Sequence, residues 1–325
     1  MNQAATLEQL YTPVATPLGE VRTAIDALWR DTLALIGVEA DQAPPTAGKL
    51  LRPALCLLTA GAAGAEDPRR FVQLATSLEA LHIASLTHDD VVDHAMVRRG
   101  LPSLNAQWDN HAAVLGGDFL VARGVEMLAT YESGQLVLDV VAVLRRMAEG
   151  ELRFFGRREA PISREDCIML AEYKTASLFA EACRAPAALV SPDLAPAMAR
   201  FGKSLGVAFQ IVDDVLDLSQ PATTLGKPAC GDVAEGKKTL PILFLREGLD
   251  AAERDRLGAM SGTTLTDADR TWIGAMGERT GALEQSLAAA REYADQARAA
   301  LQTLAPSSYR DSLSGLVDFV LERNA

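Results

Sequence analysis

Apolar side chains recur along the chain at the three- and four-residue spacing of amphipathic helices. Two segments show this spacing, through Leu74, Leu78, Leu81 and Leu86 and through Leu136, Val137, Val140, Val141 and Leu144. Alternating runs of β-branched residues, which would indicate strands, are scarce. The pattern predicts an all-α protein with about ten or more helices.

Clusters of Pro, Gly and Ser separate the helical segments, and we interpret them as helix connections. They are PPTAG (44–48), GAAGAEDP (61–68), RGLPS (99–103), EAPIS (159–163) and LVSPDLAP (189–196). Ser163 and Thr264, each followed by acidic residues, are expected to start helices. Because no low-complexity linker divides the chain, we expect a single domain over residues 1–325.

Charge and cysteine usage exclude several classes of protein. Acidic residues outnumber basic ones by 43 to 31, a net charge of −12, which argues against a nucleic-acid partner. Apolar runs fall short of the roughly 18–20 residues of a membrane span, and the N-terminus resembles no secretory signal. The four cysteines show no zinc-like spacing, so free thiols in a cytoplasmic protein are the simplest interpretation.

The segment HDDVVDHAMVRRG places Asp89, Asp90 and Asp93 shortly before Arg98 and Arg99. On a helix, residues four apart share a face, so two of the carboxylates would lie side by side while Asp90 points elsewhere. Neighbouring carboxylates repel one another unless a cation lies between them, and such oxygen ligands suit Mg²⁺ that also binds substrate phosphates. The arginines would then bind diphosphate oxygens. A solvated acidic turn is the alternative.

A second segment, FQIVDDVLD, repeats the pattern with Asp213, Asp214 and Asp217 among apolar neighbours. Its apolar surroundings make a purely solvated face a poor explanation. Basic residues also occur in short distinctive contexts: Lys49, Arg52, Lys174, Lys227, Lys237 and Lys238. Together, two aspartate triplets and these cations predict a site for two diphosphates and several Mg²⁺ ions.

These motifs resemble those of the trans-isoprenyl (polyprenyl) diphosphate synthases. The matching pieces are GKLLRP, LHIASLTHDDVVDHAMVRRGLPSLN, GGDFL, EYKTASLF, LGVAFQIVDDVLD and LGKPACGDVAEGKKTLP, which span about residues 45–245 in the family's order. The resemblance implies an all-α bundle around a deep central cavity. It also implies a homodimer and head-to-tail condensation of isopentenyl diphosphate with allylic diphosphates.

The resemblance also implies a role for each matching residue. The Mg²⁺ ligands would be Asp89, Asp93 and Asp213, supported by Asp90, Asp214 and Asp217. The allylic diphosphate would be bound by Arg98, Lys174, Thr175, Gln210, Lys227 and Lys237. Isopentenyl diphosphate would be bound by Lys49, Arg52, His82 and Arg99. Asp89, Asp93, Lys174, Asp213 and Lys227 would contribute most to catalysis, and Mn²⁺ would substitute for Mg²⁺.

In the family, ionisation of the allylic diphosphate gives a carbocation that isopentenyl diphosphate attacks, and the released diphosphate is thought to accept the proton lost. A side-chain base is therefore not required, and we favour a supporting role for His88 over a role as base. The growing chain would run along the helix before Asp89. Ala84 and Ser85, about 6–7.5 Å from Asp89, are small, and Leu81 one turn further is not aromatic. We therefore expect a long-chain, octaprenyl-type product that membrane enzymes take over.

Three positions depart from the family pattern: Leu50 replaces a second basic residue, Arg153 a common Gln and Cys230 a usual Gly. None of them removes a predicted metal ligand. The alternatives are a short-chain farnesyl or geranylgeranyl diphosphate synthase, a regulatory subunit, a terpene cyclase or head-to-head prenyl coupler, and a structural scaffold. Regulatory subunits usually lose the aspartates that this chain keeps.

Overall fold

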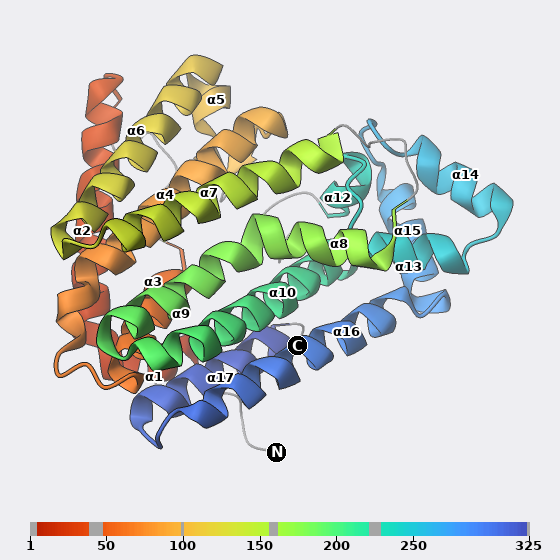
Figure 1. Ribbon diagram of the computed structural model, residues 1–325. Helices are drawn as coiled ribbons and strands as arrows, with labels where there is room; N and C mark the ends of the chain where they lie inside the picture. The colour runs from red at the N-terminus through yellow and green to blue at the C-terminus, as the bar shows by residue number, and fades with distance from the viewer. Residues whose placement is uncertain (1–4, 39–47, 99–100, 156–161, 221–228, 324–325) are drawn as a thin grey trace.

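The structure is a computed structural model that describes residues 5–38, 48–98, 101–155, 162–220 and 229–323 (Figure 1). In chain order the helices are α1 (Leu7–Tyr11), α2 (Ala15–Leu35), α3 (Leu51–Ala62), α4 (Val72–Val92), α5 (Leu104–Gln107), α6 (Asn110–Leu128), α7 (Gly134–Phe155), α8 (Arg164–Ala171), α9 (Ser177–Val190), α10 (Ala195–Ser219), α12 (Gly231–Ala234), α13 (Leu240–Gly248), α14 (Ala251–Ala259), α15 (Asp267–Arg279), α16 (Ala282–Ala300) and α17 (Ser308–Glu322). The predicted all-α class is confirmed.

Strands are confined, in the described residues, to a short antiparallel pair between α4 and α5. In this pair β1 (Val97–Arg98) and β2 (Leu101–Pro102) lie side by side, with Val97 opposite Pro102. The connection predicted at RGLPS therefore contributes β2. Within the same described ranges, no helix is both long and apolar enough to cross a membrane.

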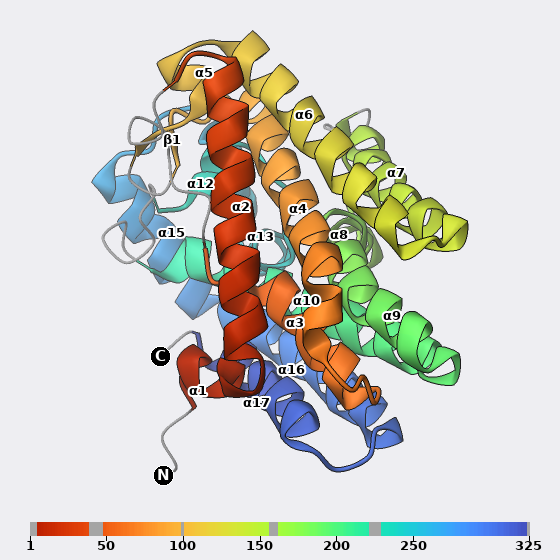
Figure 2. The same cartoon turned by 90° about the vertical axis from the view of Figure 1, so that its left-hand side faces the viewer.

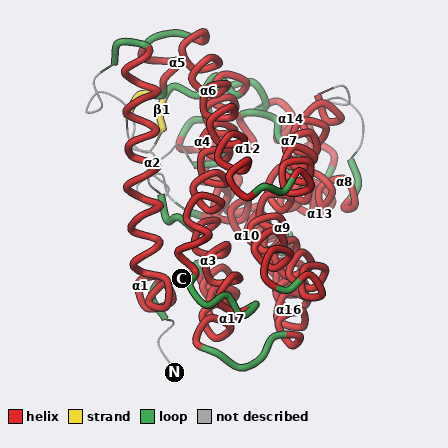
Figure 3. Tube along the Cα trace, turned by 60° about the vertical axis from the view of Figure 1, so that its left-hand side comes forward, coloured by secondary structure: helices red, strands yellow, loops and turns green. Residues whose placement is uncertain are grey.

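Helix α10 lies between α9 and α16 and is the most deeply buried long helix (Figure 1). Side chains such as Phe201, Leu205 and Ile211 are almost fully buried along it. On the other side of the bundle, α4 packs along α6, with α2 beside them (Figure 2). The helices α12 to α15 gather at one end of the bundle, around an apolar cluster that includes Leu245 and Ile273 (Figure 1). Figure 3 shows that helices make up most of the described chain.

Two predicted helix starts had different outcomes. Ser163 caps α8 with a reciprocal hydrogen-bond pair to Asp166, as expected. The start predicted at Thr264 is wrong by two residues, because Thr266 is the cap of α15 and forms the reciprocal pair with Asp269. The spacing T-x-x-D occurs twice in this stretch, from Thr264 and from Thr266, so the sequence pattern did not distinguish them.

Candidate active site

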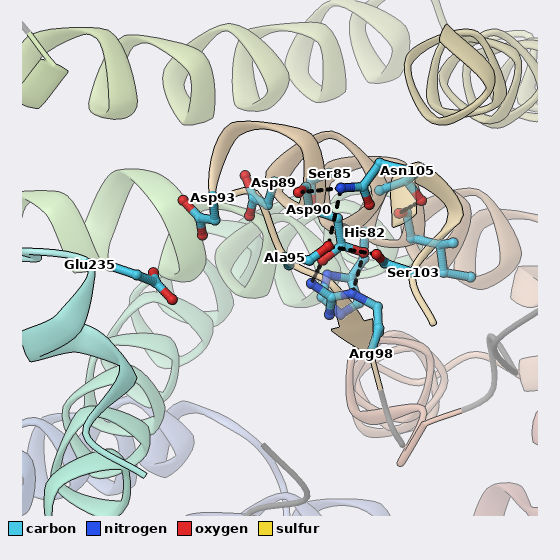
Figure 4. Close-up of polar contacts among 12 residues, drawn as sticks. His82, Ser85, Asp89, Asp90, Asp93, Ala95, Arg98, Ser103, Asn105 and Glu235 are labelled. Atoms are coloured by element: carbon cyan, nitrogen blue, oxygen red, sulfur yellow. Dashed lines mark hydrogen bonds and ion pairs between the residues drawn. The ribbon is translucent and has the colours of Figure 1, made fainter. Parts of the chain in front are cut away.

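The first aspartate motif occupies the last turn of α4. Asp89 and Asp93 point to the same side, towards the segment that carries Glu235, whereas Asp90 points to Arg98 (Figure 4). Asp93 is the C-terminal cap of the helix, and its backbone N–H donates to the Asp89 carbonyl at 2.8 Å. The four-residue spacing thus places the two carboxylates together, as the sequence predicts.

Two lysines from distant parts of the chain reach these carboxylates. Lys174 Nζ lies 3.3 Å from Asp89 and 2.6 Å from Glu151 of α7. It belongs to a π-helical turn, Glu172–Ala176, between α8 and α9, and such turns occur often at functional sites. Lys237 lies in the segment after α12. Its Nζ is 3.1 Å from Asp93 and also contacts Glu235.

Burial and these ion pairs have opposite effects on the pKa values of Asp89, Lys174 and Lys237. Burial raises the pKa of Asp89, and the positive charge of Lys174 only partly offsets this effect. Burial alone would lower the pKa of Lys174, but the carboxylates of Asp89 and Glu151 outweigh it and the net pKa is raised. The pKa of Lys237 is raised in the same way, against burial, chiefly by Asp232 and Asp93. Both lysines therefore remain charged at neutral pH.

Arg98, predicted to bind diphosphate, forms a two-pronged ion pair with Asp90 at 2.6 and 2.5 Å (Figure 4). Asp90 is buried, with 4% of its surface exposed. The loop after α4 is fixed nearby, because the Asn105 side chain donates to the carbonyls of Asp90 and Ala95, both at 3.1 Å. Ser103 Oγ also donates to the Ala95 carbonyl. Asp90 therefore orients Arg98 in this structure.

The second motif lies on α10, and its three carboxylates have different environments. Asp213 pairs with Arg323 at 2.8 Å, just after α17. Asp214 accepts the Gln210 side-chain amide at 2.7 Å, and Gln210 in turn accepts the Thr175 hydroxyl at 2.5 Å. Burial, together with the nearby Asp232 carboxylate, raises the pKa of Asp214 well above its ordinary range.

Asp217 connects the two motifs through a chain of contacts. Its carboxylate accepts the backbone N–H of Asp232 at 3.0 Å. The Asp232 carboxylate lies 4.0 Å from Lys237 Nζ, and that lysine pairs with Asp93 of the first motif. The structure therefore brings the two aspartate motifs to one site through the segment around α12.

A cluster of cations and aromatic rings adjoins Asp213. The Arg323 guanidinium lies 4.4 Å from the Phe209 ring centre, and Arg52 lies 4.7 Å from that of Phe179. The two rings are 5.3 Å apart. Burial lowers the pKa of Arg52 to about 10, opposed by Glu79 and Asp213. Lys49 lies over Phe319, and burial and Arg323 lower its pKa. This concentration of positive charge suits an anionic group.

The donor set fits a magnesium–diphosphate complex. In the described ranges, no group of three or more acidic, His or Cys side chains is arranged to hold a metal on its own. Mg²⁺ commonly binds through one or two carboxylates and completes its shell with water and substrate phosphates. Asp89 and Asp93, whose carboxylates share one face of α4, have the chemistry for such binding, and so does Asp213 on α10.

The remaining predicted residues lie as follows. Ala84 and Leu81 are fully buried on α4, and Leu81 packs against Gly124 of α6. Ser85 is half-buried and its hydroxyl donates to the carbonyl of His82, which is also half-buried. Arg99 and Lys227 lie outside the described residues.

The three departures from the family pattern have distinct surroundings. Leu50 and Cys230 both have a positive φ, of 50° and 57°, and the preference of glycine for such backbone explains why position 230 usually carries it. The Arg153 guanidinium lies 5.8 Å from the ring centre of Tyr173, next to Lys174 in sequence.

A family model described as polyprenyl synthetase matches residues 39–271. The chain belongs to the polyprenyl synthetase family. It is 34% identical over 318 residues to the all-trans-nonaprenyl-diphosphate synthase (geranyl-diphosphate specific) of Rhodobacter capsulatus, covering 97% of this chain and 98% of that protein. It is also 34% identical over 285 residues to the short chain isoprenyl diphosphate synthase of Methanothermobacter thermautotrophicus, covering 85% and 86%.

The structural comparison agrees with the family assignment. The polyprenyl synthase from Caulobacter crescentus CB15, solved in complex with calcium and isoprenyl diphosphate, superposes with a TM-score of 0.90 at 33% identity, and both chains are covered completely. This confirms the resemblance inferred from the motifs and the all-α isoprenoid-synthase fold. As a polyprenyl synthetase, the chain belongs among the prenyltransferases.

Three contacts of the site were not predicted from the sequence. Arg323, Glu151 and Glu235 each pair with a predicted site residue: Asp213, Lys174 and Lys237, respectively. The sequence offered three signals for these residues. Arg323 is a basic residue after the apolar helix LVDFVLE, and Glu151 and Glu235 are acidic residues inside GELRFF and EGKKTLP. None of these signals is specific without the fold.

Proposed function

We propose that this polyprenyl synthetase is a Mg²⁺-dependent, long-chain all-trans polyprenyl diphosphate synthase. It would condense isopentenyl diphosphate head-to-tail with allylic diphosphates, and all 325 residues would act as one functional unit. The main support is the pair of carboxylates Asp89 and Asp93 on one face of α4, each contacted by a lysine from a different element. A site that binds both metal and diphosphate needs this alternation of charge.

In this proposal the cations bind the allylic diphosphate and favour its departure. Lys174 and Lys237, now paired with carboxylates, would turn to the phosphate oxygens, and Arg98 is already oriented by Asp90. Negative charge grows on the leaving diphosphate, so these cations stabilise the transition state more than the ground state. Bound Mg²⁺ would supply further charge neutralisation at the same oxygens, held by Asp89, Asp93 and Asp213.

Isopentenyl diphosphate would bind to Lys49, Arg52 and His82, and to Arg99, which lies outside the described residues. Charge-assisted hydrogen bonds from guanidinium groups suit phosphate oxygens. The aromatic rings beside Arg52 would keep its guanidinium in place. This arrangement would hold the two diphosphates on opposite sides of the reacting carbons.

Incubating the purified protein with Mg²⁺, isopentenyl diphosphate and farnesyl diphosphate, and sizing the products, tests the proposal. We expect chains longer than geranylgeranyl diphosphate. Chains of twenty carbons only would support a geranylgeranyl-type short-chain synthase, an alternative that the Methanothermobacter relative keeps open. A farnesyl-type synthase and a regulatory subunit would both leave farnesyl diphosphate unextended. Geranyl diphosphate as the allylic substrate separates these two, because only the synthase would extend it to fifteen carbons.

Product length should depend on Ala84, because it is small and fully buried one turn before the metal site. Ala84→Phe should shift the product towards farnesyl or geranylgeranyl diphosphate while condensation continues. The control is Ala80→Phe, one further turn from Asp89, which should shorten the product less. An unchanged product length in Ala84→Phe would show that this part of α4 does not limit the chain.

We also propose a homodimer. Large apolar side chains are exposed on α6 and α7, at Val114, Leu115, Leu138, Val141 and Leu152. Such a cluster of exposed apolar residues is typical of an interaction surface, and a two-fold axis would bury the same surface of both copies. Sedimentation of a monomer at micromolar concentration would contradict this part of the proposal.

A further inference from the structure

Two glycines of α6 allow α4 to pack unusually close to it. A Cβ atom added at Gly124 would lie 3.0 Å from Leu81 Cδ2, and one at Gly117 would lie 2.2 Å from His88 Nε2. Leu81 contacts Gly124 and His88 contacts Gly117. His88 follows Leu81 by seven residues on α4, whereas Gly117 precedes Gly124 by seven residues on α6. The two helices therefore run antiparallel in a fixed register, and any side chain at position 117 would displace the His88 ring.

The His88 ring also makes polar contacts with α6. Its Nε2 lies 3.1 Å from the Val114 carbonyl oxygen and 3.5 Å from a carboxylate oxygen of Asp118. Both neighbours are hydrogen-bond acceptors, so Nε2 must carry a proton and donate. The imidazole is thus held in a notch that only glycine leaves open, and it ties α4 to α6 at that point.

The His88 contact with α6 lies at the end of α4 that is electrostatically least favourable. The carboxylates of Asp89, Asp90 and Asp93 lie in and just after the last helical turn, at the negative end of the helix dipole, where negative charge is unfavourable. The chain then turns through His94, which has a positive φ of 52°. His88 immediately precedes the first of these carboxylates.

We propose that His88 is a positioning residue for the reaction. By fixing the last turn of α4 against α6, it sets the position of Asp89 and Asp93 relative to Lys174 and Lys237. This inference rests on the proposed function, because it assumes that these carboxylates bind the metal–diphosphate complex. His88 would not touch the substrate.

The test measures binding of inorganic diphosphate in the presence of Mg²⁺ by calorimetry, together with the melting temperature of each variant. His88→Ala should weaken binding by about 10–100-fold, the usual effect of losing a group that orients a metal ligand. His88→Gln, whose amide can donate at the place of Nε2, should remain within a few fold of the wild type. Gly117→Ala, which displaces the ring, should behave like His88→Ala.

A double variant and a reference variant make the test decisive. If His88 acts through the notch, Gly117→Ala should add nothing to His88→Ala, since both remove the same interaction. Should His88→Ala fail to fold, the contrast between His88→Gln and Gly117→Ala decides. Wild-type binding by His88→Ala, or equal losses in His88→Ala and His88→Gln, would overturn the inference. Asp89→Ala is the reference: unchanged binding there would instead refute the proposed metal site.

Discussion

The carboxylates at the end of α4 are each paired with a cation, whereas those on α10 have mixed partners. In the first motif Asp89 pairs with Lys174, Asp90 with Arg98 and Asp93 with Lys237. In the second motif Asp213 pairs with Arg323. The other two accept N–H groups, from Gln210 and from the backbone of Asp232.

The difference shows that the same D-D-x-x-D spacing does not fix the role of each aspartate. A carboxylate paired with a flexible lysine can exchange that partner for a metal ion or a phosphate. A buried carboxylate that accepts an N–H group of the protein is part of the surrounding structure and is costly to move. We therefore expect the first motif to act mainly in binding, and the second to divide between binding at Asp213 and support at Asp214 and Asp217.

The largest effect is expected for the carboxylates that have exchangeable cationic partners. Asp89→Ala and Asp213→Ala should each lower kcat on the order of 10³-fold, because several kcal/mol of charge stabilisation is lost. Steady-state kinetics, with melting curves to verify folding, measure this. Excess EDTA should abolish turnover of the wild type, and normal turnover under those conditions would rule out a metal requirement.

The next largest effect should separate the two diphosphates. Lys174→Ala should chiefly affect the allylic substrate or kcat, because Lys174 adjoins Asp89. Arg52→Ala should chiefly raise KM for isopentenyl diphosphate. Each loss of a charge-assisted contact should cost about 1.5–3 kcal/mol. Equal effects of both variants on both substrates would contradict the division of the site.

Part of this site could be predicted because it depends on local geometry. The shared face of Asp89 and Asp93 follows from the helical repeat alone, and apolar periodicity was enough for the all-α class. The cationic partners could not be predicted in this way. Lys237 lies 144 residues from Asp93, and Arg323 lies 110 residues from Asp213, so only the packing of whole helices brings them together.

Two further features of the site could not be predicted from the sequence, for other physical reasons. The π-helical turn that contains Lys174 changes the helical repeat over only five residues, Glu172–Ala176, which is too short to alter the apolar pattern. The pairing of Arg98 with Asp90 is also unexpected from sequence, where both residues are charged and could equally contact substrate. Asp90 pairs with Arg98 because Asp90 is buried and needs a partner within the protein.

A moderate effect, on stability rather than on rate, is expected at Asp217. This carboxylate is 1% exposed and accepts the N–H of Asp232. Asp217→Ala leaves that buried N–H without its acceptor, which should cost about 1–3 kcal/mol of unfolding free energy. Chemical denaturation measures the cost. A loss of kcat as large as that of Asp213→Ala, with unchanged stability, would instead place Asp217 among the metal ligands.

The smallest effect should be a gain in stability at Asp214. Its pKa is raised in the folded state by burial and by Asp232, so the folded protein binds the proton more tightly than the unfolded chain does. The resulting destabilisation is absent below the ordinary aspartate pKa of 3.8 and grows as pH rises through the folded-state value. Asp214→Asn keeps an oxygen for the Gln210 amide but cannot ionise. It should therefore raise the melting temperature in EDTA by a few degrees at neutral pH, and the gain should disappear below about pH 4.

Asp213→Asn is the matched control and should show no gain, because it loses the ion pair with Arg323. Equal gains in both variants would mean that the second motif is destabilised as a whole, and that its members do not differ as their partners indicate.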